Sequence, residues 1–156
     1  MTFKVTDKYF KTIYTKEKNP TKSNIHFIII DSWDSDSVIR LYKDAGWWKD
    51  DYSPDDIPKI IKESFRFCIG INTNTGETIA TGRIISDGVS TGYIQDLCVL
   101  KQSRGIGVGS FLLQYLINVA GSAGLNQIIL VAEPDTTGFY ERAGLVSLER
   151  KTFFLF

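Results

Sequence analysis

Three glycines at alternate positions, Gly105, Gly107 and Gly109, are the residues of this chain best suited to bind a ligand. They follow a strand-like run at 93–99 and lead directly into an apolar stretch with helical spacing. Because glycine has no side chain, the backbone N–H groups of such a turn can lie against a ligand. The N-terminus of the following helix adds unpaired N–H donors and a partial positive charge. The spacing therefore predicts an anion site suited to phosphate groups.

The glycine turn matches neither of two common phosphate-binding motifs. The P-loop string G-x-x-x-x-G-K-[ST] does not occur in the sequence. The dinucleotide fingerprint G-x-G-x-x-G is met by Gly105 and Gly107, but its third position holds Ser110. A dinucleotide-binding domain also places this turn after its first strand, whereas here three strand-like runs precede it. Glycine turns also form for structural reasons alone, so the turn by itself leaves the ligand open.

The elements that must position this turn can be read from hydrophobic spacing and turn residues. Short β-branched runs predict strands, and apolar residues at helical spacing predict helices. The run at 127–132 is almost wholly apolar, as expected of a strand buried on both faces. Three consecutive runs joined by tight turns predict an antiparallel meander. The predicted strands are 26–31, 67–72, 78–86, 93–99, 127–132 and one or two within 146–156; the predicted helices are 34–45, 53–64, 110–120 and 136–143.

This order of elements predicts an α/β (α+β) fold: a mixed, mostly antiparallel sheet with helices on both faces. A chain of 156 residues suits one domain with a real core. Residues 25–156 are expected to form it, and residues 1–24 to be an N-terminal arm or an added edge element. Formal net charge is zero, which gives no broad attraction to nucleic acid or to a membrane surface.

The cysteines and the N-terminal residues indicate the cellular compartment of the protein. Cys68 and Cys98 both lie in apolar runs, which is typical of reduced core thiols. Together with the lone His26 they cannot make a standard zinc set, so no metal is expected. The N-terminus lacks an apolar leader, and no apolar run is long enough to span a membrane. A cytoplasmic protein is therefore expected.

Two sequence motifs narrow the ligand. Arg104–Gly109 reads R-x-x-G-x-G, and Phe139–Leu145 reads F-Y-E-R-A-G-L. The first resembles the pyrophosphate loop of the GNAT superfamily, the acyl-CoA-dependent N-acetyltransferases. The second is similar to the F-Y-E-[KR]-x-G-F signature of the same family, with Leu145 in place of Phe. The element order also agrees with that family from about residue 25 to 156, and residues 96–99 occupy the place of its bulged fourth strand.

The resemblance implies that acetyl-CoA is the co-substrate and that the sheet splays open after the fourth strand. Pantetheine would then bond the exposed backbone of that strand, and the pyrophosphate would lie in the glycine turn. A lone glycine turn could serve a nucleotide instead. By motif position, the residues implied for pantetheine are Leu97, Cys98 and Val99, and those for the pyrophosphate loop are Arg104, Gly105, Ile106, Gly107, Val108, Gly109 and Ser110.

The resemblance also implies direct transfer of an acetyl group to a primary amine, with Tyr140 as general acid. Its phenol, with a reference pKa near 10, is protonated at pH 7 and can donate to a thiolate. A packed helix aromatic is the other interpretation of Tyr140. The general base is open: Gln95 cannot take a proton, and Asp96 is the nearest carboxylate, acting through ordered water. Strand alternation puts Asp96 on the face opposite Tyr93 and Gln95, unless the bulge rotates it. Asp96 could equally bond nearby backbone, and water alone could remove the proton.

The acceptor is the part of the reaction that the sequence defines least. Trp47, Tyr93 and Gln95 are expected to contact it. Aromatics and acids in residues 47–52 favour a cationic amine, through cation–π and charge contacts, although a core tryptophan and solvated acids would give the same pattern. Small amines and protein amines both remain open. The apolar end, Phe153–Phe156, suggests a last strand or a homodimer contact. A non-catalytic acyl-CoA-binding or sensor module is the main alternative function.

Overall fold

The computed structural model describes residues 24–148, which form a sheet with helices on its two faces. Ten elements follow one another along this part of the chain. In order they are β1 (Ile25–Ile30), α2 (Ser35–Ala45), α3 (Asp56–Glu63), β2 (Arg66–Asn72), β3 (Glu77–Ile85), β4 (Thr91–Val99), the short 3₁₀ helix η1 (Lys101–Ser103), α4 (Val108–Ser122), β5 (Gln127–Leu130) and α5 (Thr137–Arg142).

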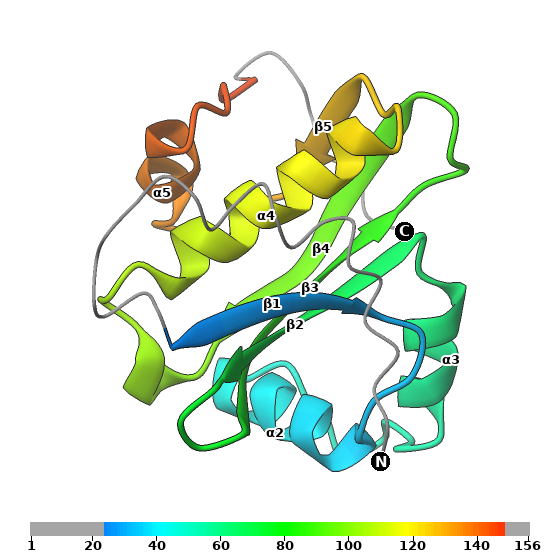
Figure 1. Ribbon diagram of the computed structural model, residues 1–156, viewed down its shortest axis with the longest axis vertical. Coiled ribbons are helices and arrows are strands. Elements are labelled where there is room, and N and C mark those ends of the chain that lie inside the picture. Colours follow the sequence, from blue (N-terminus) through cyan, green and yellow to red (C-terminus); the bar gives the residue numbers. More distant parts are fainter. Residues whose placement is uncertain (1–23, 149–156) are drawn as a thin grey trace.

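The five strands lie in the order β1-β2-β3-β4-β5. The first four are antiparallel, and β5 runs parallel to β4. Figure 1 shows α4 and α5 on one side of this sheet and α2 and α3 on the other. The predicted mixed sheet, its antiparallel meander and its two helical layers are confirmed.

Strand β4 carries a bulge opposite Gly82 of β3. Arg83 pairs with Gln95 and Thr81 pairs with Cys98, so two residues of β4 oppose Gly82 alone. The first of the two, Asp96, has a φ of 55°. A Cβ on Gly82 would lie 2.9 Å from the Leu116 side chain of α4, so glycine is what lets the helix approach the sheet here. The bulge bends β4 beside the cleft of the candidate active site.

The core consists of two apolar layers, one on each face of the sheet. On one face, α4 contributes Leu112, Leu113 and Leu116, all fully buried. On the other face, buried side chains of α2 and α3 pack on the strands. Burial of a large aliphatic side chain stabilises a fold by roughly 1.5–3 kcal/mol, so these layers hold the sheet between the helices.

Two helices begin two or three residues away from their predicted starts. α4 begins at Val108, two residues earlier than expected, because Gly107 (φ 89°) serves as its N-cap. It also continues past its predicted end at residue 120 as far as Ser122, and the turn comes at Gly124, which has a φ of 87°. α3 begins at Asp56 because Ser53 and Pro54 form a preceding turn, in which the Ser53 carbonyl accepts from the Asp56 N–H at 3.1 Å.

The prediction that residues 127–132 are buried on both faces is wrong. β5 ends at Leu130, and the Ile129 and Val131 side chains are 43% and 46% exposed. An apolar run indicates that its side chains favour burial. Whether they are buried depends on which elements of the fold cover them. Residues 146–148 are not in a strand, and the rest of the predicted strand at 146–156, including Phe153–Phe156, lies outside the described residues, as do residues 1–23 of the predicted arm.

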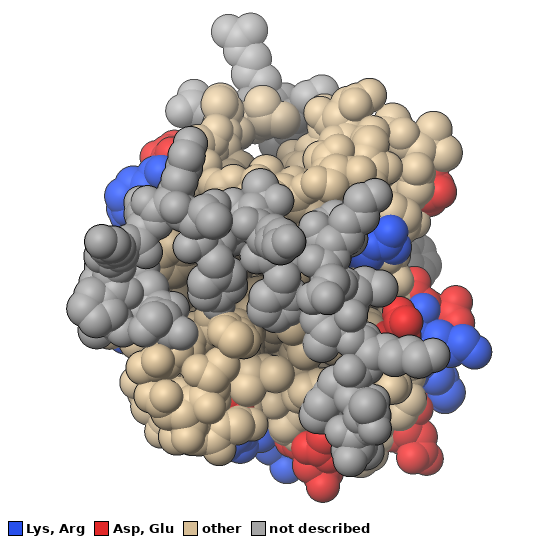
Figure 2. Space-filling model, viewed as in Figure 1, with Lys and Arg blue, Asp and Glu red and all other residues tan. Residues whose placement is uncertain are grey.

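Two further findings concern membrane-spanning helices and the distribution of charge on the surface. Between residues 24 and 148, no helix combines the length and apolar character needed to cross a bilayer. Figure 2 shows acidic and basic side chains close together along the rim of the face that it draws, in keeping with a formal net charge of zero.

Candidate active site

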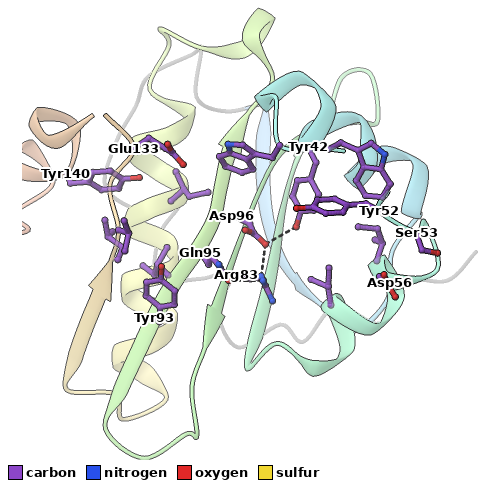
Figure 3. Close-up of a pocket in the computed structure, with 18 residues that line it drawn as sticks. Tyr42, Tyr52, Ser53, Asp56, Arg83, Tyr93, Gln95, Asp96, Glu133 and Tyr140 are labelled. Carbon is purple, nitrogen blue, oxygen red and sulfur yellow. Dashed lines mark hydrogen bonds and ion pairs between the residues drawn. The ribbon is translucent and has the colours of Figure 1, made fainter. Parts of the chain in front are cut away.

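A cleft of about 640 Å³ opens beside the end of the β4–β5 pairing (Figure 3). Its walls come from six elements, from the loop between α2 and α3, and from the loop between β5 and α5. The lining residues are Tyr42, Trp47, Trp48, Tyr52, Ser53, Asp56, Ile57, Ile60, Arg83, Tyr93, Ile94, Gln95, Asp96, Leu97, Leu130, Val131, Glu133 and Tyr140.

The cleft exists because β4 and β5 separate. Their pairing runs from Thr91 with Gln127 to Ile94 with Leu130, and β4 then continues alone on that side as far as Val99. Within the described residues, β4 therefore has backbone N–H and C=O groups beyond Ile94 that face the gap between the two strands. These are the groups that would hydrogen-bond to a parallel neighbour. The splayed sheet implied by the resemblance is present, and Leu97, Cys98 and Val99 lie on its open strand.

The glycine turn has the backbone geometry of an anion cradle. Gly105 and Gly107 have φ values of 80° and 89°, which only glycine adopts without strain. The first turn of α4 has no side-chain cap, so its N–H donors remain available to a ligand. A Cβ on Gly109, by contrast, would make an ordinary 3.5 Å contact with Phe139. The backbone conformation therefore requires glycine at positions 105 and 107, but it does not require glycine at position 109.

Arg104 holds the turn in place. Its Nε donates a hydrogen bond to the Val99 carbonyl at 2.8 Å. One of its terminal nitrogens lies 3.7 Å from the Asp44 carboxylate, which also accepts from the Lys101 N–H at 2.8 Å. Arg104 thus ties the start of the glycine turn to the end of β4 and to α2.

Asp96 is held by two donors that use the same carboxylate oxygen. Arg83 Nε donates to Asp96 Oδ2 at 2.7 Å, and the Tyr42 hydroxyl donates to that oxygen at 3.1 Å (Figure 3). Burial raises the pKa of Tyr42 far above its usual range, with the Asp96 charge as the second cause, so the phenol stays a donor. Within residues 24–148 the hydrogen bonds to Asp96 leave Oδ1 unpaired.

The bulge decides which side chains meet in the cleft. Simple alternation would separate Asp96 from Tyr93 and Gln95, but the inserted residue rotates the chain, and all three line the same cleft. Gln95 Oε1 accepts from the second Arg83 nitrogen at 2.7 Å, which leaves its amide N–H₂ as the donor side. The structure therefore brings the predicted Asp96, Tyr93, Gln95, Trp47 and Tyr140 together.

Tyr140 lies at the opposite side of the cleft from β3. Its ring packs edge-on against Phe139, with 4.9 Å between ring centroids. Burial raises the pKa of Tyr140 above 10, and the nearby Glu133 carboxylate raises it further. Both effects keep the hydroxyl protonated at neutral pH, as a proton donor requires. Figure 3 shows Glu133 and Tyr140 on the same side of the cleft.

Sequence reasoning missed several lining residues. Arg83 carried a signal, because a charged side chain inside an otherwise apolar strand needs a partner. Tyr42 and Glu133 carried none, since their relation to Asp96 and Tyr140 arises only when distant segments meet. Trp48, Tyr52 and Asp56 line the cleft beside the predicted Trp47.

The two cysteines are free and buried, as predicted. Burial raises the pKa of Cys98 to about 12 and that of Cys68 well above its ordinary value. A thiol must ionise to act as a nucleophile or a metal ligand, so neither cysteine is suited to those roles. Residues 24–148 contain no cluster of three or more side chains that could hold a metal ion.

Comparison with known proteins agrees with this geometry. The chain is 32% identical to the glucosamine 6-phosphate N-acetyltransferase of Candida albicans over 75 residues, which are 48% of this chain and 50% of that protein. It is 30% identical to the chloroplastic serotonin N-acetyltransferase 2 of Oryza sativa subsp. japonica over 73 residues, 47% of this chain and 36% of that protein. The matches thus span half or less of these relatives' length.

A solved structure extends the likeness over most of the described fold. The glucosamine-6-phosphate N-acetyltransferase of Arabidopsis thaliana superposes with a TM-score of 0.65 at 18% identity, covering 84% of this chain and 99% of that one. At this identity the match speaks for the fold. Residues 25–145 match the sequence pattern of the Acetyltransferase (GNAT) family. The chain belongs to the Acetyltransferase (GNAT) family.

Proposed function

We propose that this protein is an N-acetyltransferase that moves an acetyl group from acetyl-CoA to a primary amine by direct transfer. One observation carries the proposal: the open edge of β4 and the Tyr140 hydroxyl border the same cleft, and β4 leads through η1 into the glycine turn. Family membership supports the same activity.

The donor site in this proposal follows the open strand. Leu97, Cys98 and Val99 offer backbone groups to pantetheine, and residues 105–110, next to Arg104, enclose the pyrophosphate. The two left-handed glycines and the uncapped start of α4 fit a phosphate group, because N–H donors and the helix dipole both favour an anion. When bound, acetyl-CoA supplies a thioester whose carbonyl carbon an amine can attack.

Tyr140 acts as the general acid in this scheme. As the carbon–nitrogen bond forms and the carbon–sulfur bond breaks, its hydroxyl proton passes to the departing sulfur. The raised pKa of Tyr140 ensures that the proton is present at neutral pH. A positioned acid of this kind contributes roughly 10²–10⁴-fold to a rate.

The proton that leaves the amine is assigned to Asp96, through ordered water. Arg83 and Tyr42 both bind Oδ2, which fixes the carboxylate and leaves Oδ1 for this purpose. Transfer without an acyl-enzyme is supported by the cysteines, because burial keeps Cys98 and Cys68 protonated and therefore poorly nucleophilic.

The test is release of the CoA thiol from acetyl-CoA in the presence of a panel of amines. Amine-dependent thiol release, with an acetylated amine as product, is expected. Tight binding of acetyl-CoA with no thiol release from any amine would replace this proposal with a non-catalytic acyl-CoA sensor. Competition by ATP or NAD⁺ but not by CoA would instead make the turn a nucleotide site.

A further inference from the structure

We infer that the acceptor is a cationic amine with an apolar or aromatic body and no phosphate or carboxylate group. This inference rests on the proposed function and names the substrate class of the same cleft. It comes from the chemistry of the cleft wall opposite Tyr140 and from the balance of charges inside it.

The wall formed by α3 and the preceding loop is largely apolar. Trp47, Trp48 and Tyr52 come from the loop, and Ile57 and Ile60 come from α3. Trp48 and Tyr52 meet edge to face, with 5.8 Å between their centroids, and Tyr52 is 48% exposed. Aromatic faces of this kind favour an apolar body, and their π-systems also attract cations.

Among the described residues that line the cleft, negative charge is in excess. Arg83 is the only Lys or Arg among the lining residues in the described part of the chain. Its side chain is 18% exposed, and two of its three nitrogens already donate, to Asp96 and to Gln95, at 2.7 Å each. Three carboxylates, those of Asp56, Asp96 and Glu133, oppose this single guanidinium.

This balance discriminates between acceptor classes. A phosphate dianion would enter an excess of negative charge among the described lining residues, where the one guanidinium is already paired with Asp96. An ammonium group would be attracted by the same carboxylates. A phosphorylated amino sugar therefore fits this cleft poorly, while a plain amine fits it well.

The two sides of the cleft give the acceptor a direction. Figure 3 shows Tyr140 and Glu133 on one side and Ser53 and Asp56 on the other, with the β4 residues between them. The reacting amine belongs beside Tyr140, and its body extends toward the aromatic wall. Asp56 sits at that far side, where its only close ionic contact in residues 24–148 is the exposed Lys59 at 2.9 Å.

The experiment compares matched pairs of amines that differ by one anionic group. 2-Phenylethylamine is set against phenylalanine, and glucosamine against glucosamine 6-phosphate. We expect kcat/KM for 2-phenylethylamine to exceed that for either anionic amine at least tenfold. A preference for phenylalanine or for glucosamine 6-phosphate would overturn the inference while leaving the proposed acetyl transfer intact.

Binding gives a readout that does not depend on turnover. Quenching of tryptophan fluorescence by each amine, with CoA present, measures affinity at the wall that holds Trp47 and Trp48. If no amine releases thiol but 2-phenylethylamine still binds at least tenfold more tightly than glucosamine 6-phosphate, the proposed function fails and the inferred ligand class stands. Equal or reversed affinities would overturn the ligand class.

Two pairs of variants locate the recognition. Asp56→Asn should weaken 2-phenylethylamine binding about threefold, whereas Asp55→Asn, the same change one residue outside the cleft lining, should not. Trp48→Ala should weaken binding about tenfold; the half-exposed Tyr52→Ala tests the same wall should Trp48→Ala fail to fold. Equal effects of Asp56→Asn and Asp55→Asn, together with unchanged binding in both aromatic variants, would overturn the assigned wall.

Discussion

Arg83 Nε and Asp96 Oδ2 lie 2.7 Å apart across the bulge of β4. The two side chains are 18% and 22% exposed, so the pair is partly shielded from water and less screened by salt than a surface ion pair. The same guanidinium also holds Gln95. One arginine of β3 thus fixes both polar side chains that the bulge turns into the cleft.

Asp96→Asn should lower kcat at least tenfold, because the amide cannot take a proton from the attacking amine. The matched variant Arg83→Met breaks the same pair but keeps the carboxylate, so its loss of kcat should be smaller. Steady-state kinetics between pH 6 and 9 decide the matter. Identical losses of kcat in both variants would show that Asp96 has only a positioning role.

Tyr140→Phe removes the hydroxyl and keeps the ring that packs on Phe139. We expect kcat to fall about a hundredfold, the low end of the range for a general acid, with little change in the Kd of acetyl-CoA. In the parent protein, the raised pKa of Tyr140 should keep its contribution to kcat present up to pH 10 and lose it only above that value. Stopped-flow thiol release and calorimetry separate the two parameters; an unaltered kcat would rule out the acid role.

Gly107→Ala should weaken acetyl-CoA binding about tenfold or more. Alanine at a φ of 89° costs roughly 1–2 kcal/mol, and its Cβ would lie 3.3 Å from the Phe111 ring, so the N–H groups of the turn should shift. Gly121→Ala is the control, because this helical glycine has open space around it and alanine favours the helix. Isothermal titration calorimetry gives both affinities. Equal binding by the two variants would contradict a pyrophosphate site at the turn.

Stability should fall as the pH rises above 9. The unfolded chain releases each thiol proton near the ordinary value of 9.0, whereas the folded chain keeps the Cys98 proton to about pH 12. The unfolded state then binds fewer protons, so each such group removes about 1.4 kcal/mol of stability per pH unit in that window. Cys68 adds to the effect, and Tyr42 does so above pH 10.

Urea unfolding between pH 8 and 10.5 measures this slope. Cys98→Ala should make it shallower by the contribution of one thiol, although the variant is less stable at neutral pH. A slope that Cys98→Ala leaves unchanged would show that this thiol ionises as readily in the folded chain as in the unfolded one.

The sequence by itself determined the order and type of the elements and the place of the glycine turn. These features depend on local chemistry: hydrophobic periodicity, the positive φ that Gly105 and Gly107 permit, and the start of an apolar helix directly after them. The two motifs around Arg104 and Tyr140 identified the family for the same reason, since each is contiguous in the chain.

Only the tertiary structure decided which side chains contact one another in the cleft. The bulge that turns Asp96 toward Gln95 lies opposite Gly82 of the neighbouring strand, and the Asp96 carboxylate is held by an ion pair with Arg83 of β3 and a hydrogen bond from Tyr42 of α2. The exposure of β5 likewise depends on what covers it. Such contacts join segments tens of residues apart. No local sequence pattern encodes them, because they stabilise the protein only when folding brings the distant partners together and removes them from water.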